Sequence, residues 1–182
     1  QLYFNPVTYT TTPDGTRTVI KPDPFAGFIL GFQPSRPTSR GRIDLRANDP
    51  AAPPLIRPNS LATDEDRAQV IAGGRLCQRL ITSTALTGLV QSAMGPDLRE
   101  MDDAAILEDF RHRSGTVFHP VGTCRMGADA ATSVVDPGLR LHGVTGLRVV
   151  DASVFPNLTS ANTNAPTMML AHRAADLILS DL

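Results

Sequence analysis

The stretch that decides how this chain ends its fold is Ser160-Ala161-Asn162-Thr163-Asn164-Ala165-Pro166-Thr167-Met168-Met169. Pro166 fits the first position of a helix, where its missing N–H leaves nothing unpaired, and Asn164 is able to cap that helix. Apolar residues then recur three or four positions apart to the chain end, at Met169, Leu170, Ala174, Leu177 and Ile178. This spacing predicts a final helix with one apolar stripe.

A strand is expected just before that helix. Residues 147–150 are mostly apolar and β-branched, and Asp151 follows them. An acidic residue at the end of a strand can bind a ribose, but it is more often a turn former or a helix cap.

The N-terminal part of the chain is typical of β structure. Residues 2–9 and 17–20 are strand candidates, and Pro13-Asp14-Gly15 between them favours a tight turn, so a hairpin is predicted. Residues 25–32 form an apolar run typical of a buried strand, and residues 43–46 alternate apolar and charged side chains as a half-buried strand does.

Two helices are predicted in the middle of the chain. Thr63 and Asp66 have the spacing of a capping box, and helical periodicity follows over residues 64–84, with weak points at the glycines 73–74. A second helix is expected over residues 102–112.

The fold class predicted from this order is α+β. Residues 48–58 are rich in Pro and Ala and are expected to be irregular. Strands and helices are segregated instead of alternating, which favours an antiparallel or mixed sheet with flanking helices.

Composition excludes several classes of protein. The chain carries 17 basic and 18 acidic residues, a net charge of -1, so no basic surface for nucleic acid is indicated. No apolar run has the length of a membrane span. The two cysteines indicate no disulfide framework, so a cytoplasmic protein is expected. Cys77 and Cys124 lie too far apart for a zinc motif, so no metal site is predicted.

The chemistry is concentrated around His119, in the stretch Phe118-His119-Pro120-Val121-Gly122-Thr123-Cys124-Arg125-Met126-Gly127. An isolated histidine in a loop is often a structural residue bonded to a carbonyl. Here the neighbouring aromatic, proline and glycines fix the backbone while letting other segments approach closely, which suits a positioned base. An unperturbed imidazole is largely neutral at pH 7 and able to accept a proton.

These motifs resemble the C-terminal signature of the glucose-methanol-choline (GMC) oxidoreductase family. The likeness is strong over residues 115–182 and weaker over 34–49 and 54–61. It implies a substrate-binding part with the histidine loop over residues 1–133. Residues 134–182 would then be a strand-helix segment that returns to the flavin domain and completes the flavin site.

The resemblance also implies the catalytic residues. His119 matches the family's base and would take the hydroxyl proton of an alcohol while the carbinol carbon gives hydride to flavin N5. Asn162 matches its partner, a His in some members and an Asn in others, and would hydrogen-bond the alcohol oxygen.

Further residues are implied to bind the cofactor, FAD. Asp151 and Ala152 would lie beside its diphosphate or ribityl chain. Thr163, Asn164 and Ala165 would meet the flavin ring at the start of the last helix, where unpaired N–H groups favour negative charge. On local sequence alone, an ordinary capped helix packing on a core is the favoured interpretation of this helix start.

The family's dinucleotide-binding unit carries a GxGxxG turn, which these 182 residues lack. The N-terminal FAD-binding domain is therefore expected to be absent from these residues. Supplied as a separate domain or chain, it would be the chief partner of this one. The chain alone is expected to bind flavin weakly or not at all, and to expose an apolar face that favours homo-oligomers.

The predicted function is oxidation of a primary alcohol, choline-like or another, with oxygen or a quinone as acceptor. Two alternatives remain open at this point. One is a flavin-free binding or structural module, and the other is a redox-neutral hydroxynitrile lyase of the same family.

Overall fold

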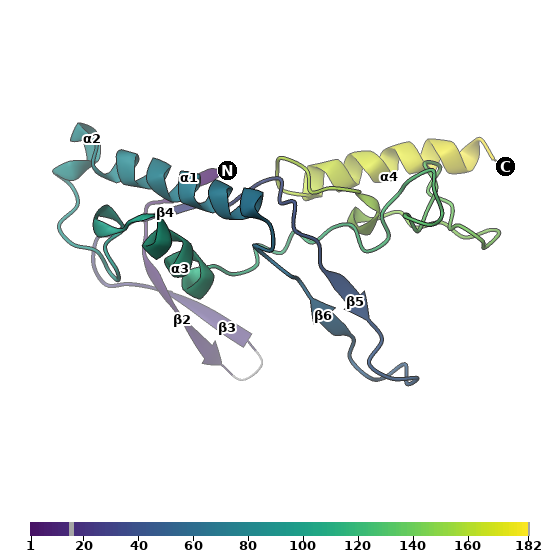
Figure 1. The fold of residues 1–182 in the computed structure, drawn as a ribbon, viewed down its shortest axis with the longest axis horizontal. Coiled ribbons are helices and arrows are strands. Elements are labelled where there is room, and N and C mark those ends of the chain that lie inside the picture. The colour runs from purple at the N-terminus through teal and green to yellow at the C-terminus, as the bar shows by residue number, and fades with distance from the viewer. Residues whose placement is uncertain (15–16, 182) are drawn as a thin grey trace. The chain divides into compact units, whose positions relative to one another are not determined.

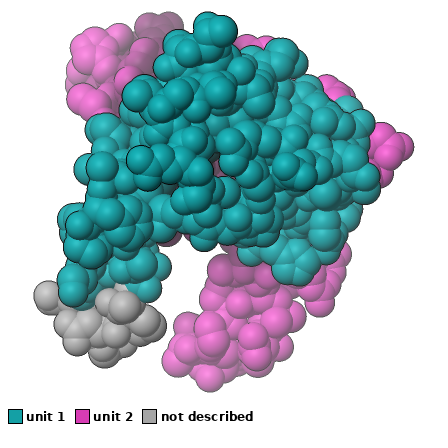
Figure 2. All heavy atoms as spheres, turned by 90° about the vertical axis from the view of Figure 1, so that its left-hand side faces the viewer, with its two compact units in different colours: residues 1–34, 68–113 teal, residues 35–67, 114–182 magenta. Residues whose placement is uncertain are grey.

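The computed structural model describes residues 1–14 and 17–181, and these form a mixed α+β protein (Figure 1). Within the described residues, three separate two-stranded antiparallel ladders accompany four α-helices. The chain divides into two compact units, residues 1–34 with 68–113 and residues 35–67 with 114–182 (Figure 2). The α+β class is confirmed, but the strands form small ladders in place of one sheet.

The three ladders have the following bounds: β1 (Leu2–Asn5) pairs with β4 (Ile29–Phe32), β2 (Tyr9–Asp14) with β3 (Arg17–Pro22), and β5 (Arg42–Asp44) with β6 (Leu55–Arg57). The expected hairpin exists as β2 and β3, although Gly15 of its turn lies outside the described residues. Residues 2–9 are not one strand, because β1 pairs with β4 and β2 pairs with β3.

Two further strand predictions were wrong in extent. The strand expected over residues 25–32 is regular only in β4, since Phe25 lies in a bend and residues 26–28 belong to no ladder. The stretch 48–58, expected to be irregular, contains β6, because Leu55–Arg57 finds a backbone partner in β5. Residues 55–57 precede Pro58, and their N–H groups are intact, so the neighbouring prolines do not prevent the ladder.

The first unit is built around α1 (Asp64–Ile81), most of which belongs to it, with α2 (Thr84–Thr87) and α3 (Asp103–Arg113) following. The predicted weak points of α1 are positions of close packing. A Cβ on Gly73 would lie 2.3 Å from Cδ2 of Phe32, and one on Gly74 would lie 2.4 Å from Cγ2 of Ile106. The absence of a side chain therefore lets β4 and α3 pack directly on the helix.

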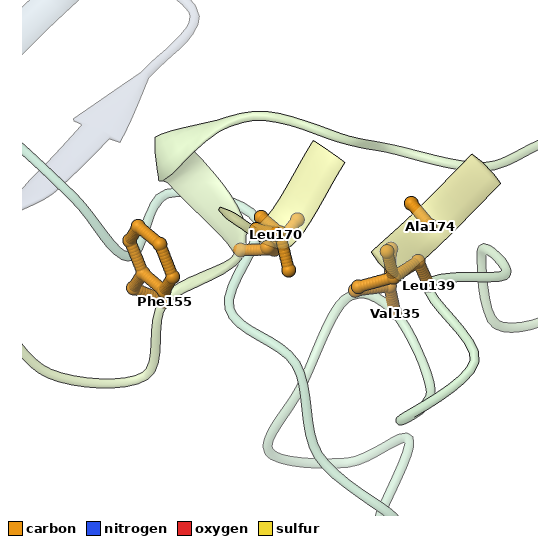
Figure 3. Packing of buried hydrophobic residues seen from close by; sticks show 6 residues of the cluster. Val135, Leu139, Phe155, Leu170 and Ala174 are labelled. Carbon is orange, nitrogen blue, oxygen red and sulfur yellow. The ribbon is translucent and has the colours of Figure 1, made fainter. Parts of the chain in front are cut away.

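The second unit holds an apolar cluster of buried side chains (Figure 3): Val135, Leu139, Val154, Phe155, Leu170 and Ala174. Leu170 and Ala174 come from α4 (Asn164–Leu179), the predicted final helix, and the others come from loops and a 3₁₀ turn. Met169 and Ile178 of the predicted stripe are exposed instead, Met169 by 63%.

The strand expected over residues 147–150 does not form. Arg148 makes a single bridge with Arg140, and the backbone of this region bonds in isolated pairs, such as Met126 N to Val154 O at 2.8 Å. Helix α4 therefore covers a core of hydrogen-bonded loops in place of a sheet.

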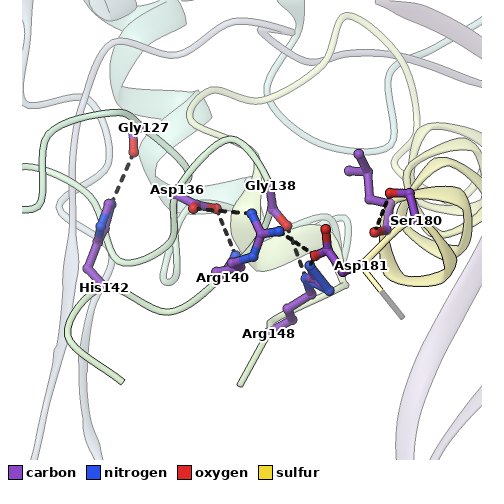
Figure 4. A network of polar contacts seen from close by, with 9 residues as sticks. Gly127, Asp136, Gly138, Arg140, His142, Arg148, Ser180 and Asp181 are labelled. Atoms are coloured by element: carbon purple, nitrogen blue, oxygen red, sulfur yellow. Dashed lines mark hydrogen bonds and ion pairs between the residues drawn. The ribbon is translucent and has the colours of Figure 1, made fainter. Parts of the chain in front are cut away.

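A polar network ties the end of α4 to the loops beneath it (Figure 4). The Asp181 carboxylate pairs with both Arg140 and Arg148, and Arg148 Nε also donates to Gly138 O at 3.2 Å. The backbone N–H of Arg140 donates to Asp136 Oδ1 at 2.9 Å. These arginines make carboxylate and carbonyl contacts that fix the far end of the last helix.

None of the helices in the described part of the chain combines the length and the apolar character that crossing a bilayer requires. Over the same residues, no group of three or more His, Cys, Asp or Glu side chains is arranged to hold a metal ion.

Candidate active site

The loop that carries His119 is sharply bent on both sides of the histidine. Phe118 has a φ of 62°, a left-handed conformation that is unfavourable for an aromatic residue, and its side chain is 82% exposed. Its backbone N–H donates to Thr116 Oγ1 at 3.0 Å, and Gly122 has a φ of 88°. Strained backbone of this kind clusters at functional sites, and here the strained residue directly precedes the predicted base, whereas Gly122 adopts its positive φ without strain.

His119 itself is half-buried and bonded across the second unit. Its Nδ1 lies 2.9 Å from Oγ1 of Thr163, a residue 44 positions away that is only 8% exposed. This bond joins the histidine loop to the start of α4, so the two most informative sequence motifs meet in space.

Helix α4 begins one residue earlier than a cap at Asn164 would place it. Asn164 is its first residue and Thr163 its N-cap, so Pro166 occupies the third helical position instead of the first. The predicted cap at Asn164 was therefore wrong. The Thr163 side chain makes no capping bond to the first turn, while Asn164 and Ala165 are exposed.

Asn162 is exposed and directly precedes Thr163. The bond between His119 and Thr163 therefore brings the imidazole to the immediate neighbour of this carboxamide. A titratable ring and a neutral amide thus lie near the same end of α4, and that both face one alcohol stays a prediction.

Asp151 and Ala152 lie in a short turn beside the apolar cluster. The Asp151 carboxylate accepts a hydrogen bond from the Ser153 N–H at 2.8 Å and so caps the 3₁₀ turn η2 (Ala152–Val154). The interpretation of this acid as a cap is confirmed. A contact of Asp151 or Ala152 with the cofactor stays a prediction.

The buried carboxylate of Asp66 organises the loop at residues 38–39. The sequence predicted only a capping role for this residue. Asp66 is 2% exposed, and it accepts hydrogen bonds from the backbone N–H groups of Thr38 at 2.7 Å and Ser39 at 2.9 Å. Burial raises the pKa of this carboxyl, but the hydrogen bonds from Ser39 and Thr38 outweigh it and lower the pKa from 3.8 to about 2. The carboxylate is therefore held ionised.

The loop that Asp66 holds reaches the segment that leads to Asn162. Arg36 Nε donates to Ser160 Oγ at 2.5 Å, and Arg40 donates to the Asn157 side chain. Neither arginine was a candidate, because no local pattern links residues 36–40 to 157–160. The only signal was the capping-box spacing of Asp66, whose carboxylate bonds the 38–39 loop.

Comparison with known proteins identifies the family. The sequence profile of the GMC oxidoreductase C-terminal domain matches residues 37–171, so the chain belongs to the GMC oxidoreductase family. This confirms the resemblance drawn from the His119 and Asn162 motifs.

Two curated relatives show the range of named activities. An alcohol dehydrogenase [acceptor] of Pseudomonas putida is 43% identical over 153 residues, which are 84% of this chain and 28% of that protein. An oxygen-dependent choline dehydrogenase of Vibrio vulnificus is 38% identical over 154 residues, again 84% of this chain and 28% of that protein. The chain thus spans little more than a quarter of the length of these relatives.

Solved structures agree with the fold. A formate oxidase variant from Aspergillus oryzae has a TM-score of 0.73 at 30% identity, covering 79% of this chain and 25% of that one. A fungal aryl-alcohol oxidase has a TM-score of 0.71 at 29% identity, covering 87% and 26%.

Proposed function

We propose that this chain supplies the catalytic base and the substrate side of an FAD-dependent oxidoreductase that acts on primary alcohols. The observation that carries the proposal is the His119–Thr163 bond, which holds a half-buried imidazole at the start of α4 beside Asn162. Family membership supports it, since the relatives include proteins named as alcohol and choline dehydrogenases.

The residues at the start of α4 fit a flavin. The N-cap makes no side-chain bond to the first turn, and Asn164 and Ala165 are exposed, so the positive end of the helix dipole is open to an electron-rich ring. When bound, FAD would supply a hydride acceptor at N5. Asp151 and Ala152 would contribute backbone contacts to its ribityl or diphosphate part.

The role of His119 is to accept the hydroxyl proton of the substrate. As the carbinol C–H bond breaks and its electron pair leaves as hydride, the C–O bond becomes a carbonyl, and the proton remains on the imidazole. General base catalysis of this kind contributes about 10²–10⁴-fold in rate. Asn162 would donate a hydrogen bond to the oxygen without competing for its proton, because a carboxamide does not titrate.

The proposal assigns the remaining parts as follows. Residues 1–133 would line the substrate side with the histidine loop, and residues 134–182 would complete the flavin site. A dinucleotide-binding segment with a GxGxxG turn, in the same or another chain, would hold the ADP part of the cofactor. A choline-like alcohol is the first substrate to test, given the relatives named choline dehydrogenases.

The test joins this chain to the FAD-binding part of the Pseudomonas putida relative, in place of the segment that the chain matches. We expect the purified hybrid to carry bound yellow flavin, and choline or another primary alcohol to bleach it without oxygen. The unaltered relative serves as the control for folding, and a His119→Gln hybrid should keep its flavin but bleach far more slowly.

Two results would contradict the proposal. A hybrid that folds as the relative does but holds no flavin would favour a flavin-free module. Flavin that binds and never bleaches with any alcohol would favour a redox-neutral lyase.

A further inference from the structure

We propose that Thr163 is a positioning residue that sets the tautomer of His119. Its Oγ1 would accept the Nδ1–H proton of the ring and leave Nε2 as the nitrogen that takes the substrate proton. The inference deepens the proposed function and rests on it for its catalytic meaning. Its physical content, the location of one proton, is independent of flavin.

The Thr163 hydroxyl does not make the bond that an N-cap hydroxyl normally makes. A threonine at this position usually accepts a hydrogen bond from the second or third N–H of its helix. The third residue of α4 is Pro166, which has no N–H, and the Thr163 side chain makes no capping bond. The hydroxyl instead lies 2.9 Å from His119 Nδ1.

The Thr163 hydroxyl is also held in place. Thr163 is 8% exposed, and its carbonyl accepts hydrogen bonds from both the backbone N–H of Thr167 at 3.0 Å and its Oγ1 at 2.7 Å. These bonds fix the backbone of Thr163, and its β-branched side chain has few rotamers. The oxygen therefore has a defined position relative to the imidazole.

The direction of the His119–Thr163 bond decides which ring nitrogen carries the proton. The Thr163 bond occupies Nδ1, so Nε2 is the ring nitrogen left for a substrate. If the hydroxyl donated to Nδ1, a neutral ring would carry its proton on Nε2 and could not accept another there. If Nδ1–H donates to Oγ1, Nε2 has its lone pair, and the same bond persists after the ring is protonated. A base that needs no reorganisation during proton transfer is the arrangement that favours catalysis.

Two other histidines provide internal standards, because a carbonyl oxygen can only accept. Nδ1 of His112 lies 3.0 Å from the Glu108 carbonyl, so His112 should carry its proton on Nδ1. Nε2 of His142 lies 3.1 Å from both the Gly127 carbonyl and Ser133 Oγ. The Ser133 hydroxyl donates to the Asp129 carbonyl at 2.6 Å, so His142 should carry its proton on Nε2. The chain thus contains a reference for each tautomer beside the residue in question.

The experiment is long-range ¹H–¹⁵N NMR of the histidine-labelled 182-residue chain, at about pH 8.5, where ordinary imidazoles are neutral. We expect His119 to match the Nδ1–H pattern of His112. In Thr163→Val, which removes the hydroxyl, the ratio of Nδ1–H to Nε2–H tautomers should fall about fivefold, the factor that corresponds to about 1 kcal/mol for a hydrogen bond. Thr163→Ser, which keeps the hydroxyl, should remain within about twofold of the starting ratio.

The outcomes are decisive in both directions. A His119 ring that carries its proton on Nε2 in the unaltered chain overturns the inference, even if the valine variant does not fold. An unchanged ratio in a valine variant whose His112 and His142 signals are unaltered also overturns it. Because the spectra need no flavin and no alcohol, a failure of the proposed function leaves this result readable by itself.

Discussion

A threonine directly precedes both α1 and α4, Thr63 and Thr163, but the two hydroxyls make different hydrogen bonds. At α1, Thr63 Oγ1 accepts from the Asp66 N–H at 3.2 Å, and the first turn carries three acids. At α4, the first turn has no acid, and the Thr163 hydroxyl bonds to His119 instead of to its own helix.

This difference supports the proposal that the start of α1 is structural and the start of α4 meets a cofactor. The polar groups of α1 are bonded to the chain itself, and Asp66 fixes the 38–39 loop. The first turn of α4 lacks both a side-chain cap and a compensating carboxylate, which leaves its positive end available. Changes at the start of α1 should therefore affect stability, and changes to the residues that meet at the start of α4, such as His119, should affect chemistry.

The largest expected effect is on the rate of alcohol oxidation, at the histidine that bonds to the start of α4. In the flavin-bearing hybrid, His119→Gln should lower the rate of flavin reduction by an alcohol by about 10²–10⁴-fold, because the proton has no acceptor. Stopped-flow measurement without oxygen gives this rate directly. The matched control is His172→Gln, at an exposed position of α4, which should leave the rate unchanged. Equal rates in the two variants would contradict the role of His119.

The next largest effect is on stability at α1. Asp66→Asn should lower the free energy of unfolding by about 2–4 kcal/mol, because the amide places a donor against two backbone N–H donors. Urea denaturation of the chain measures it. Asp64→Asn changes a fully exposed acid in the same turn and should cost less than about 0.5 kcal/mol. If the two variants were equally stable, the buried carboxylate would not anchor the loop.

The same carboxylate predicts acid sensitivity. Its pKa is lowered in the folded chain, from 3.8 to about 2, so its contribution is complete above pH 3.8 and is lost as the pH falls toward 2. We expect about 2 kcal/mol of stability to disappear across that interval. Urea midpoints measured at several acidic pH values test this, and Asp66→Asn should flatten the dependence. A slope that is unchanged in the variant would assign the effect to other groups.

The smallest expected effect is on the free energy of unfolding when either Thr63 or Thr163 is replaced by valine. Thr63→Val removes a capping acceptor that also bonds Thr38 Oγ1 at 2.6 Å, and it should cost about 1–2 kcal/mol. Thr163→Val removes no capping bond, and water can reach the half-buried His119, so about 0.5 kcal/mol is expected. Thermal melts of both variants give the order. The reverse order would mean that α4 depends on its threonine as a cap.

Much of this comparison was visible in the sequence. Periodicity located the helices that became α1, α3 and α4 to within a few residues, because local spacing determines an amphipathic helix. Strand predictions were less accurate, since β6 depends on a partner in β5, and the β-branched run at 147–150 has no partner over its length. A ladder depends on distant residues that a local pattern does not contain.

The candidate site divides in the same way. The motifs make His119 and Asn162 candidates, whereas the bond from His119 to Thr163 joins segments 44 residues apart and has no local signature. The position of Pro166 in the third place of α4, which removes one of the two N–H groups that the threonine hydroxyl could cap, became clear only when the helix start was known.

A crystal structure of the flavin-bound hybrid would test the central claim most directly. The account predicts that the reacting edge of the flavin ring faces both His119 Nε2 and the Asn162 carboxamide, with Thr163 Oγ1 still bonded to His119 Nδ1. A ring bound elsewhere, or either of those two side chains directed away from it, would contradict the account.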